Sequence, residues 1–184
     1  MNSLIWKLYR LSAMRPSEIL YRLQQALQSQ LEKHGVGLAK TSVAQGQSGK
    51  AWLNELPREF EIAQYCAAAD SILAGRFNVF SLTNVELGWP PKWNQDPKTG
   101  ITAPHSFGKL INYRDDRVVG DIKYLWEPNR HAELVTLAQA WRLTSDNKYL
   151  NGCQILLDSW FEQCPYPLGI NWTSSLEHGI RLVN

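Results

Sequence analysis

Apolar residues recur every three or four positions in several stretches of the chain, which is the spacing of one face of an α-helix. The first such stretch covers residues 16–34. Its apolar positions are Leu20, Leu23, Leu27 and Leu31. Pro16 stands where a first helical turn tolerates proline, and Gly35 follows the last turn. We therefore predict an N-terminal amphipathic helical segment over residues 1–34.

The next region lacks any periodicity. Residues 35–50 are rich in Gly, Ser and Gln, which is typical of a flexible linker. Helical spacing then returns, and it predicts a helix from Pro57 or Arg58 to about Ala74, ended by Gly75. The linker is thus expected to separate the N-terminal segment from a larger domain over residues 51–184.

The pattern changes between Gly75 and Lys123. Short alternating pieces such as "FNVFSLTNVEL" predict two or three short strands, and the turn dipeptides in "GWPPKWNQDPKTG" predict loop. A connection of this length inside a compact domain favours a binding role, because loops beyond about 15 residues are uncommon otherwise. Its many aromatic residues argue against a disordered insert.

A helix hairpin follows this insertion. "HAELVTLAQAWRL" and "YLNGCQILLDSWF" both have helical spacing, and Ser145 between them is a candidate cap for the second helix. Pro165 and Pro167 end that helix, and a further helix opens near Asn171. The expected fold class is all-α, with an irregular, partly β insertion.

Composition and charge exclude several classes of protein. Nineteen Lys and Arg against seventeen Asp and Glu give a net charge of +2, which does not indicate a nucleic-acid binder. No apolar run is long enough to predict a membrane span, and no signal peptide is visible in the sequence. The compartment therefore stays open between cytoplasm and periplasm. Three cysteines without metal-ligand spacing are interpreted as buried thiols, so we predict no metal and no cofactor.

Two clusters of polar residues precede helices. The first, residues 121–131, combines acids, cations, an amide, an indole and an imidazole. A purely structural interpretation makes Asn129 a helix cap and pairs Glu127 with Arg130 or Lys123. His131 is the histidine of this cluster that we retain as a candidate for chemistry.

The second cluster, "NWTSSLEHGIR", begins at Asn171. Ser174 and Glu177 fit a capping box, and Glu177 and Arg181 are spaced for an ion pair along one helix. With Ser174 as the cap, the Asn171 amide is free to point away from the helix, where donors at a helix N-terminus bind an anionic oxygen such as a carboxylate. The structural alternative is that Asn171 is itself the cap.

Taken together, "NVELGWPPKWNQDPKTG", "GDIKYLWEPNRHAELVTLAQAWRLTSDNKYL" and "GINWTSSLEHGIRLVN" resemble the amino-terminal helical domain of the heparinase II/III-like polysaccharide lyases. The resemblance runs from about residue 77 to the end. Motifs for nucleotide binding, serine hydrolysis and zinc proteolysis are absent from the sequence. The resemblance implies part of an incomplete (α/α) toroid of helix hairpins that holds a uronate-containing polysaccharide, such as heparan sulfate, heparin or alginate.

The resemblance also implies a reaction and roles for residues. The lyases remove the C5 proton of a uronate by β-elimination, and donors must neutralise the adjacent carboxylate. It assigns this catalytic role to Asn171. Arg130 and His131 are expected to border the anionic site, and Trp126 and Trp172 to stack on sugar rings.

The family's catalytic Tyr and His lie downstream of the asparagine motif and cannot be assigned here. Apolar positions continue to the end of the sequence at Asn184 without a helix stop signal. We therefore expect the chain to be a truncated toroid, inactive alone, that lacks further helices and a β-sandwich domain.

One alternative from another class stays open. "LAQAWRLTSDNKYL" resembles the helix-turn-helix of tetratricopeptide units, whose stacked hairpins bind proteins without catalysis. That interpretation requires a second hairpin at the spacing of a repeat.

Overall fold

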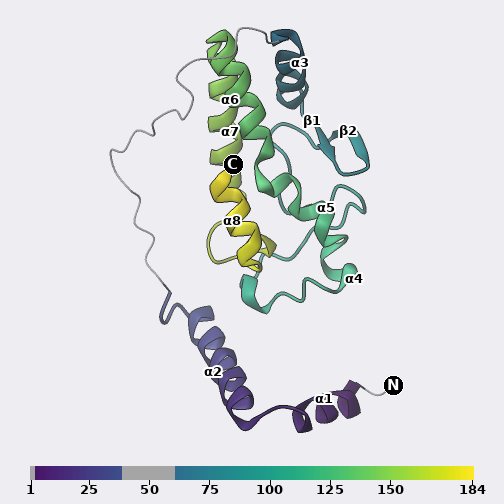
Figure 1. Ribbon diagram of the computed structural model, residues 1–184, viewed down its shortest axis with the longest axis vertical. Coiled ribbons are helices and arrows are strands. Elements are labelled where there is room, and N and C mark those ends of the chain that lie inside the picture. The colour runs from purple at the N-terminus through teal and green to yellow at the C-terminus, as the bar shows by residue number, and fades with distance from the viewer. Residues whose placement is uncertain (1–2, 39–60) are drawn as a thin grey trace. The chain divides into compact units, whose positions relative to one another are not determined.

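The computed structural model describes residues 3–38 and 61–184 (Figure 1). Most of the predicted linker over residues 35–50, and the predicted helix start at Pro57 or Arg58, lie outside the described residues. The chain divides into two compact units, residues 1–52 and 53–184, and each is described by itself. In the described part of the chain, no helix is long and apolar enough to cross a membrane.

The described residues of the N-terminal unit form two helices, α1 (Ser3–Ser12) and α2 (Pro16–Lys33). The predicted helix over residues 16–34 is confirmed, with Pro16 in its first turn and Gly35 at a φ of 83° beyond its end. The apolar stripe of α2 is exposed rather than packed: Leu20, Leu23, Leu27 and Leu31.

The second unit begins with α3 (Ile62–Leu73), β1 (Arg76–Val79) and β2 (Leu82–Glu86). The strands form an antiparallel hairpin in which Phe77 pairs with Val85, so the strand prediction for this stretch is confirmed. Gly75 ends α3 as predicted, at a φ of 76°. A Cβ there would lie 3.0 Å from the backbone of Gly88, so only glycine fits this turn.

Tight turns and one-turn helices fill residues 87–131. They comprise η1 (Gly108–Leu110), α4 (Asp116–Val119), α5 (Ile122–Trp126) and η2 (Pro128–Arg130). Asp115 and Asp121 cap α4 and α5 with their carboxylates. The buried Asp96 carboxylate accepts hydrogen bonds from the backbone N–H groups of Lys98 and Asp121. These local caps hold the loop in place, which periodicity alone could not reveal.

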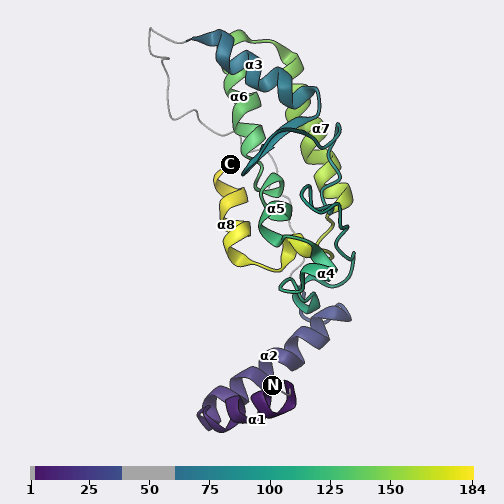
Figure 2. The same cartoon turned by 90° about the vertical axis from the view of Figure 1, so that its right-hand side faces the viewer.

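The helix hairpin is present as α6 (Ala132–Thr144) and α7 (Asn147–Gln163), which lie side by side (Figures 1 and 2). The prediction that Ser145 caps α7 is wrong. Ser145 ends α6 in the left-handed region, and the cap is Asp146, whose carboxylate accepts from the Lys148 backbone N–H. After α7, η3 (Ile170–Trp172) leads into α8 (Ser175–Val183).

The main core lies where α3 and the β-hairpin pack on α6 and α7. Its buried members include Phe77, Val79, Trp93, Leu137, Tyr149, Leu156 and Trp160. A second, smaller core joins α4 and α5 to η3 through Val119, Leu125 and Ile170. The described fold is thus mostly helical with a two-stranded antiparallel hairpin.

The three cysteines are free thiols. Cys164 is buried as predicted, whereas Cys66 and Cys153 are only partly buried. Burial raises the pKa of Cys164 to about 11, so it is protonated at neutral pH.

Candidate functional site

The two polar motifs meet in space. The amide of Asn171, in η3, donates to Oδ1 of Asn129, in η2, over 2.9 Å. These residues are 42 positions apart, and both are fully buried. We define the asparagine cluster as Asn129, Trp160, Cys164, Asn171 and Arg181.

Asn129 satisfies every polar atom of its side chain. Its Nδ2 donates to the carbonyls of Trp93 and Leu125, each over 2.8 Å. Its Oδ1 accepts from Trp160 Nε1 over 2.8 Å as well as from Asn171. Asn129, in η2, is therefore a buried residue whose side chain hydrogen-bonds to the loop at Trp93, to α7 and to η3. The interpretation of Asn129 as a helix cap is wrong.

Asn171 is less completely satisfied. Its Nδ2 donates to Asn129 and to Cys164 Sγ, over 3.1 Å, whereas its Oδ1 is buried without a hydrogen-bond partner among the described residues. The side chain is fully buried, so the amide does not point freely away from the helix as the sequence suggested. Gly169 and Ser174 occupy the cap positions of η3 and α8, so Asn171 is not a cap either.

Arg130 lies in an ion-pair network. It donates to both carboxylate oxygens of Glu177, over 2.8 and 2.9 Å, and to Glu127 over 2.6 Å. These carboxylates raise the pKa of Arg130, and the Glu177 side chain is only 2% exposed. The predicted Glu127–Arg130 pair is confirmed, but the predicted pairing of Glu177 with Arg181 is wrong. Glu177 is occupied by Arg130, and Ser174 makes no side-chain capping bond, so there is no capping box.

His131 is buried between two indoles and is not an exposed residue at the border of a groove. Its ring meets those of Trp93 and Trp160 edge-on, at centroid distances of 5.7 and 5.1 Å. Burial, and secondarily the charge of Arg181, lowers its pKa to about 4. His131 is therefore neutral at pH 7.

Trp126 and Trp172 are partly buried, with each indole N–H engaged. Trp126 Nε1 donates to the Ile170 carbonyl over 3.4 Å, and Trp172 Nε1 to the Cys164 carbonyl over 3.0 Å. The Trp172 ring also contacts Tyr166, at a centroid distance of 5.0 Å. Part of each indole stays accessible.

Arg181, in α8, was not singled out from the sequence as a site residue. Its guanidinium lies over the rings of Trp160 and Trp172, 5.2 and 5.8 Å from their centroids. It donates to the backbone carbonyl of Asn171 over 2.7 Å and, over 3.5 Å, to that of Asn129. Within residues 3–38 and 61–184, no ion pair of Arg181 with a carboxylate is found. Burial lowers its pKa, an effect that the more distant charge of Glu177 partly offsets.

His178 adjoins this cation. Its ring is 5.4 Å from that of Trp172, and its Nε2 is buried without a hydrogen-bond partner among the described residues. Burial and the charge of Arg181 lower its pKa, although a backbone hydrogen bond with Asn171 acts in the opposite direction. The charge of Arg181 and its position in the asparagine cluster distinguish α8 from a purely structural helix, and both depend on the folded structure.

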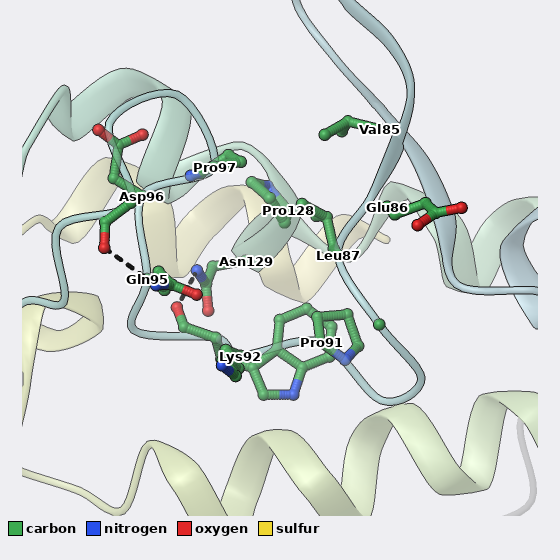
Figure 3. Close-up of a pocket in the computed structure, with 13 residues that line it drawn as sticks. Val85, Glu86, Leu87, Pro91, Lys92, Gln95, Asp96, Pro97, Pro128 and Asn129 are labelled. Atoms are coloured by element: carbon green, nitrogen blue, oxygen red, sulfur yellow. Dashed lines mark hydrogen bonds between the residues drawn. The ribbon is translucent and has the colours of Figure 1, made fainter.

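A cavity of about 390 Å³ is lined in part by the first polar motif, residues 121–131 (Figure 3). Its walls come from the end of β2, the loop over residues 91–97, and Pro128 and Asn129 of η2. Glu86 and Lys92 provide exposed charges at its wall. Asn129 is thus shared by the cavity wall and the asparagine cluster, whereas Asn171, Arg130 and His131 do not line the cavity.

The described residues contain no group of three or more His, Cys, Asp or Glu side chains placed to hold a metal ion. Comparison with known proteins found no matching family model, no matching curated protein and no matching solved structure.

Proposed function

We propose that this chain is the amino-terminal portion of a polysaccharide lyase that acts on uronate-containing chains by β-elimination. The observation that carries the proposal is the hydrogen bond between Asn129 and Asn171, because it joins the two motifs on which the resemblance depends. Around this bond lie a guanidinium without a carboxylate partner among the described residues, two partly exposed indoles and an unpaired buried acceptor.

The chemistry of the reaction explains why such groups are needed. Removal of the C5 proton places negative charge next to a carboxylate, so the site must supply hydrogen-bond donors to that carboxylate. Arg181 supplies such a donor, and its contacts with backbone carbonyls and indole faces leave its charge uncompensated. We assign it the anion-binding role that the resemblance implied for Arg130, because Arg130 is already paired with Glu177 and Glu127.

Asn171 keeps its proposed role as a carboxylate donor under one condition. Its Nδ2 must exchange one of its present acceptors for the substrate. The bond to Cys164 Sγ is the one to exchange, because sulfur is a weak acceptor whereas the bond to Asn129 Oδ1 is a normal amide hydrogen bond. Trp172, which contacts Arg181, is the indole proposed to stack on a sugar ring. Trp126, at the end of α5, donates to the Ile170 carbonyl of η3 and is proposed as a second stacking residue.

The finer architecture belongs to this proposal. The α6–α7 hairpin would be one element of the (α/α) toroid, and further hairpins would supply the catalytic Tyr and His. The tetratricopeptide alternative has less support, since α4 and α5, of four and five residues, are the only α-helices described between β2 and α6. A second hairpin at the required spacing is therefore not found within residues 61–184.

The test uses the chain together with the sequence that the proposal expects after residue 184. The purified protein is incubated with alginate, heparan sulfate and heparin, and the unsaturated uronate product is followed by its ultraviolet absorbance. We expect turnover of at least one polymer and a loss of about a hundredfold in kcat/KM for Asn171→Ala, as is usual when one donor to a developing oxyanion is removed.

Cys164→Ala is the matched control, because it changes the same buried bond and leaves the amide in place. It should keep most of the turnover. Absence of product from all three polymers, or equal losses for the two variants at matched folded fractions, would contradict the proposal.

A further inference from the structure

The first helix exposes large apolar side chains along its length. α1 exposes four large apolar or aromatic side chains, Ile5, Trp6, Tyr9 and Leu11, with exposed fractions of 60, 49, 78 and 47%. At helical spacing these four residues spread over a wide arc of α1. A soluble helix with so wide an apolar arc requires a covering partner.

All the charged side chains in residues 1–15 are basic. Residues 1–15 contain three of the nineteen Lys and Arg of the chain, at positions 7, 10 and 15, and none of the seventeen Asp and Glu. Positions 7 and 10 are three residues apart and therefore share one narrow side of the helix. The Arg10 guanidinium lies 5.2 Å from the centroid of the Trp6 ring.

We infer that α1 binds the surface of an anionic lipid bilayer. Such helices lie in the plane of the interface, with their apolar face in the acyl boundary and Lys or Arg near the lipid phosphates. Trp and Tyr favour this depth because their rings are apolar and their N–H and O–H groups are polar. This inference does not depend on the proposed enzymatic function.

Charge complementarity selects the lipid surface over the other occupants of α1. A second copy of α1 would bring two more cations and no acid, so two copies would repel each other. An acidic polysaccharide would match the cations but would leave the apolar arc in water. An anionic bilayer matches both features.

The second helix is a useful contrast. α2 also exposes leucines, but its charges are mixed, and Glu18 pairs with Arg22 over 2.8 Å. Balanced charge gives α2 no electrostatic preference for an anionic surface. The inference is therefore restricted to α1.

The experiment measures co-sedimentation of the purified 184-residue chain with vesicles. One set contains phosphatidylglycerol in phosphatidylcholine, and the other contains phosphatidylcholine alone. We expect binding to the first set, weakening as sodium chloride is raised, and at least tenfold weaker binding to the second. Arg10→Gln should weaken binding about fivefold, which is the effect of one basic residue near an anionic surface.

Variants in the apolar face give the decisive comparison. Ile5→Glu should weaken vesicle binding at least tenfold, and Ile5→Leu should retain it. Leu182→Glu is the matched control, because Leu182 is an aliphatic residue that is 88% exposed on α8. It should bind vesicles as the unchanged chain does. Circular dichroism checks that all the variants keep their helix content.

Several results would overturn the inference. They are equal affinity for the two vesicle types, equal losses for Ile5→Glu and Leu182→Glu, or no binding at low salt. Dimerisation in the absence of vesicles that Ile5→Glu abolishes would show that a second copy covers α1 instead.

Discussion

The two segments that meet at the asparagine cluster are similarly buried but differ in how completely their polar groups are paired. In residues 121–131, Asn129 satisfies all four hydrogen-bonding positions of its side chain, and Arg130 binds two carboxylates. In residues 169–184, Asn171 Oδ1 and His178 Nε2 are buried without partners among the described residues, and Arg181 binds only carbonyls and rings.

This difference separates a structural role from a candidate functional one. Buried polar groups in proteins are normally paired, and each unpaired one calls for an explanation. The first segment is closed in this respect and holds the fold together. The second has two buried polar atoms without partners among the described residues, next to a guanidinium that no carboxylate of those residues pairs with, and this makes it the candidate for binding a polar ligand.

The largest expected effect comes from breaking the ion pair in the closed segment. Arg130→Met leaves Glu177, with a side chain 2% exposed, without its cation. We expect the free energy of unfolding to fall by about 3–5 kcal/mol in urea titrations. Arg117→Met removes the exposed pair with Asp115 and should leave the free energy of unfolding nearly unchanged, because solvent screens that pair. A small loss of stability for Arg130→Met would contradict the claim that residues 121–131 hold the fold together.

Replacing Asn129, in the fully paired segment, should cost more stability than replacing Asn171. Asn129→Ala leaves several buried partners unpaired, including Trp160 Nε1, so we expect a loss of about 3 kcal/mol in the free energy of unfolding. Asn171→Ala should cost about 1 kcal/mol, because it also removes an unpaired Oδ1. The reverse order in the same urea titrations would contradict the contrast.

A pH titration sharpens the description of the core around His131. Its pKa is about 4 in the fold against 6.5 as the ordinary value, so between these values the unfolded chain binds more protons. Stability should therefore rise from pH 4 to pH 6.5, with His131 contributing at most about 3 kcal/mol. Burial raises the pKa of Glu133 from 4.5 to about 7, which gives the opposite slope over an overlapping range.

Comparison with the His131→Phe variant isolates the contribution of the histidine, since Glu133 is present in both proteins. The variant should lose less stability on acidification, as measured by thermal unfolding at each pH. An unchanged pH profile would mean that His131 is not held neutral by its burial.

The sequence predicts regular helices well, because apolar spacing and punctuation by Pro16, Gly35 and Gly75 are local signals. It fails where two neighbouring residues compete for one position. Ser145 and Asp146 are both good caps, and only the left-handed backbone of Ser145 decides in favour of Asp146.

The candidate site depends on contacts that local spacing cannot predict. Glu177 and Arg181 are well spaced along α8, but Glu177 bonds to Arg130, 47 positions away. Because of this long-range bond, Glu177 does not pair with Arg181, and the role that we propose for Arg181 could not be predicted from the sequence. In contrast, Asn129 and Asn171 both lie in the segments that carry the resemblance, and their side chains are hydrogen-bonded to each other.

The central claim is that Arg181 binds an anionic sugar, and calorimetric titration of the 184-residue chain with alginate and heparan sulfate oligosaccharides tests it most directly. Arg114→Gln is the control, because Arg114 also lies over an aromatic ring, 5.6 Å from the centroid of Tyr113. The account predicts salt-sensitive binding that Arg181→Gln weakens about tenfold, which corresponds to about 1.4 kcal/mol, and that Arg114→Gln leaves unchanged. Equal affinities for the folded Arg181→Gln variant and the unchanged chain, or no binding of either sugar, would contradict it.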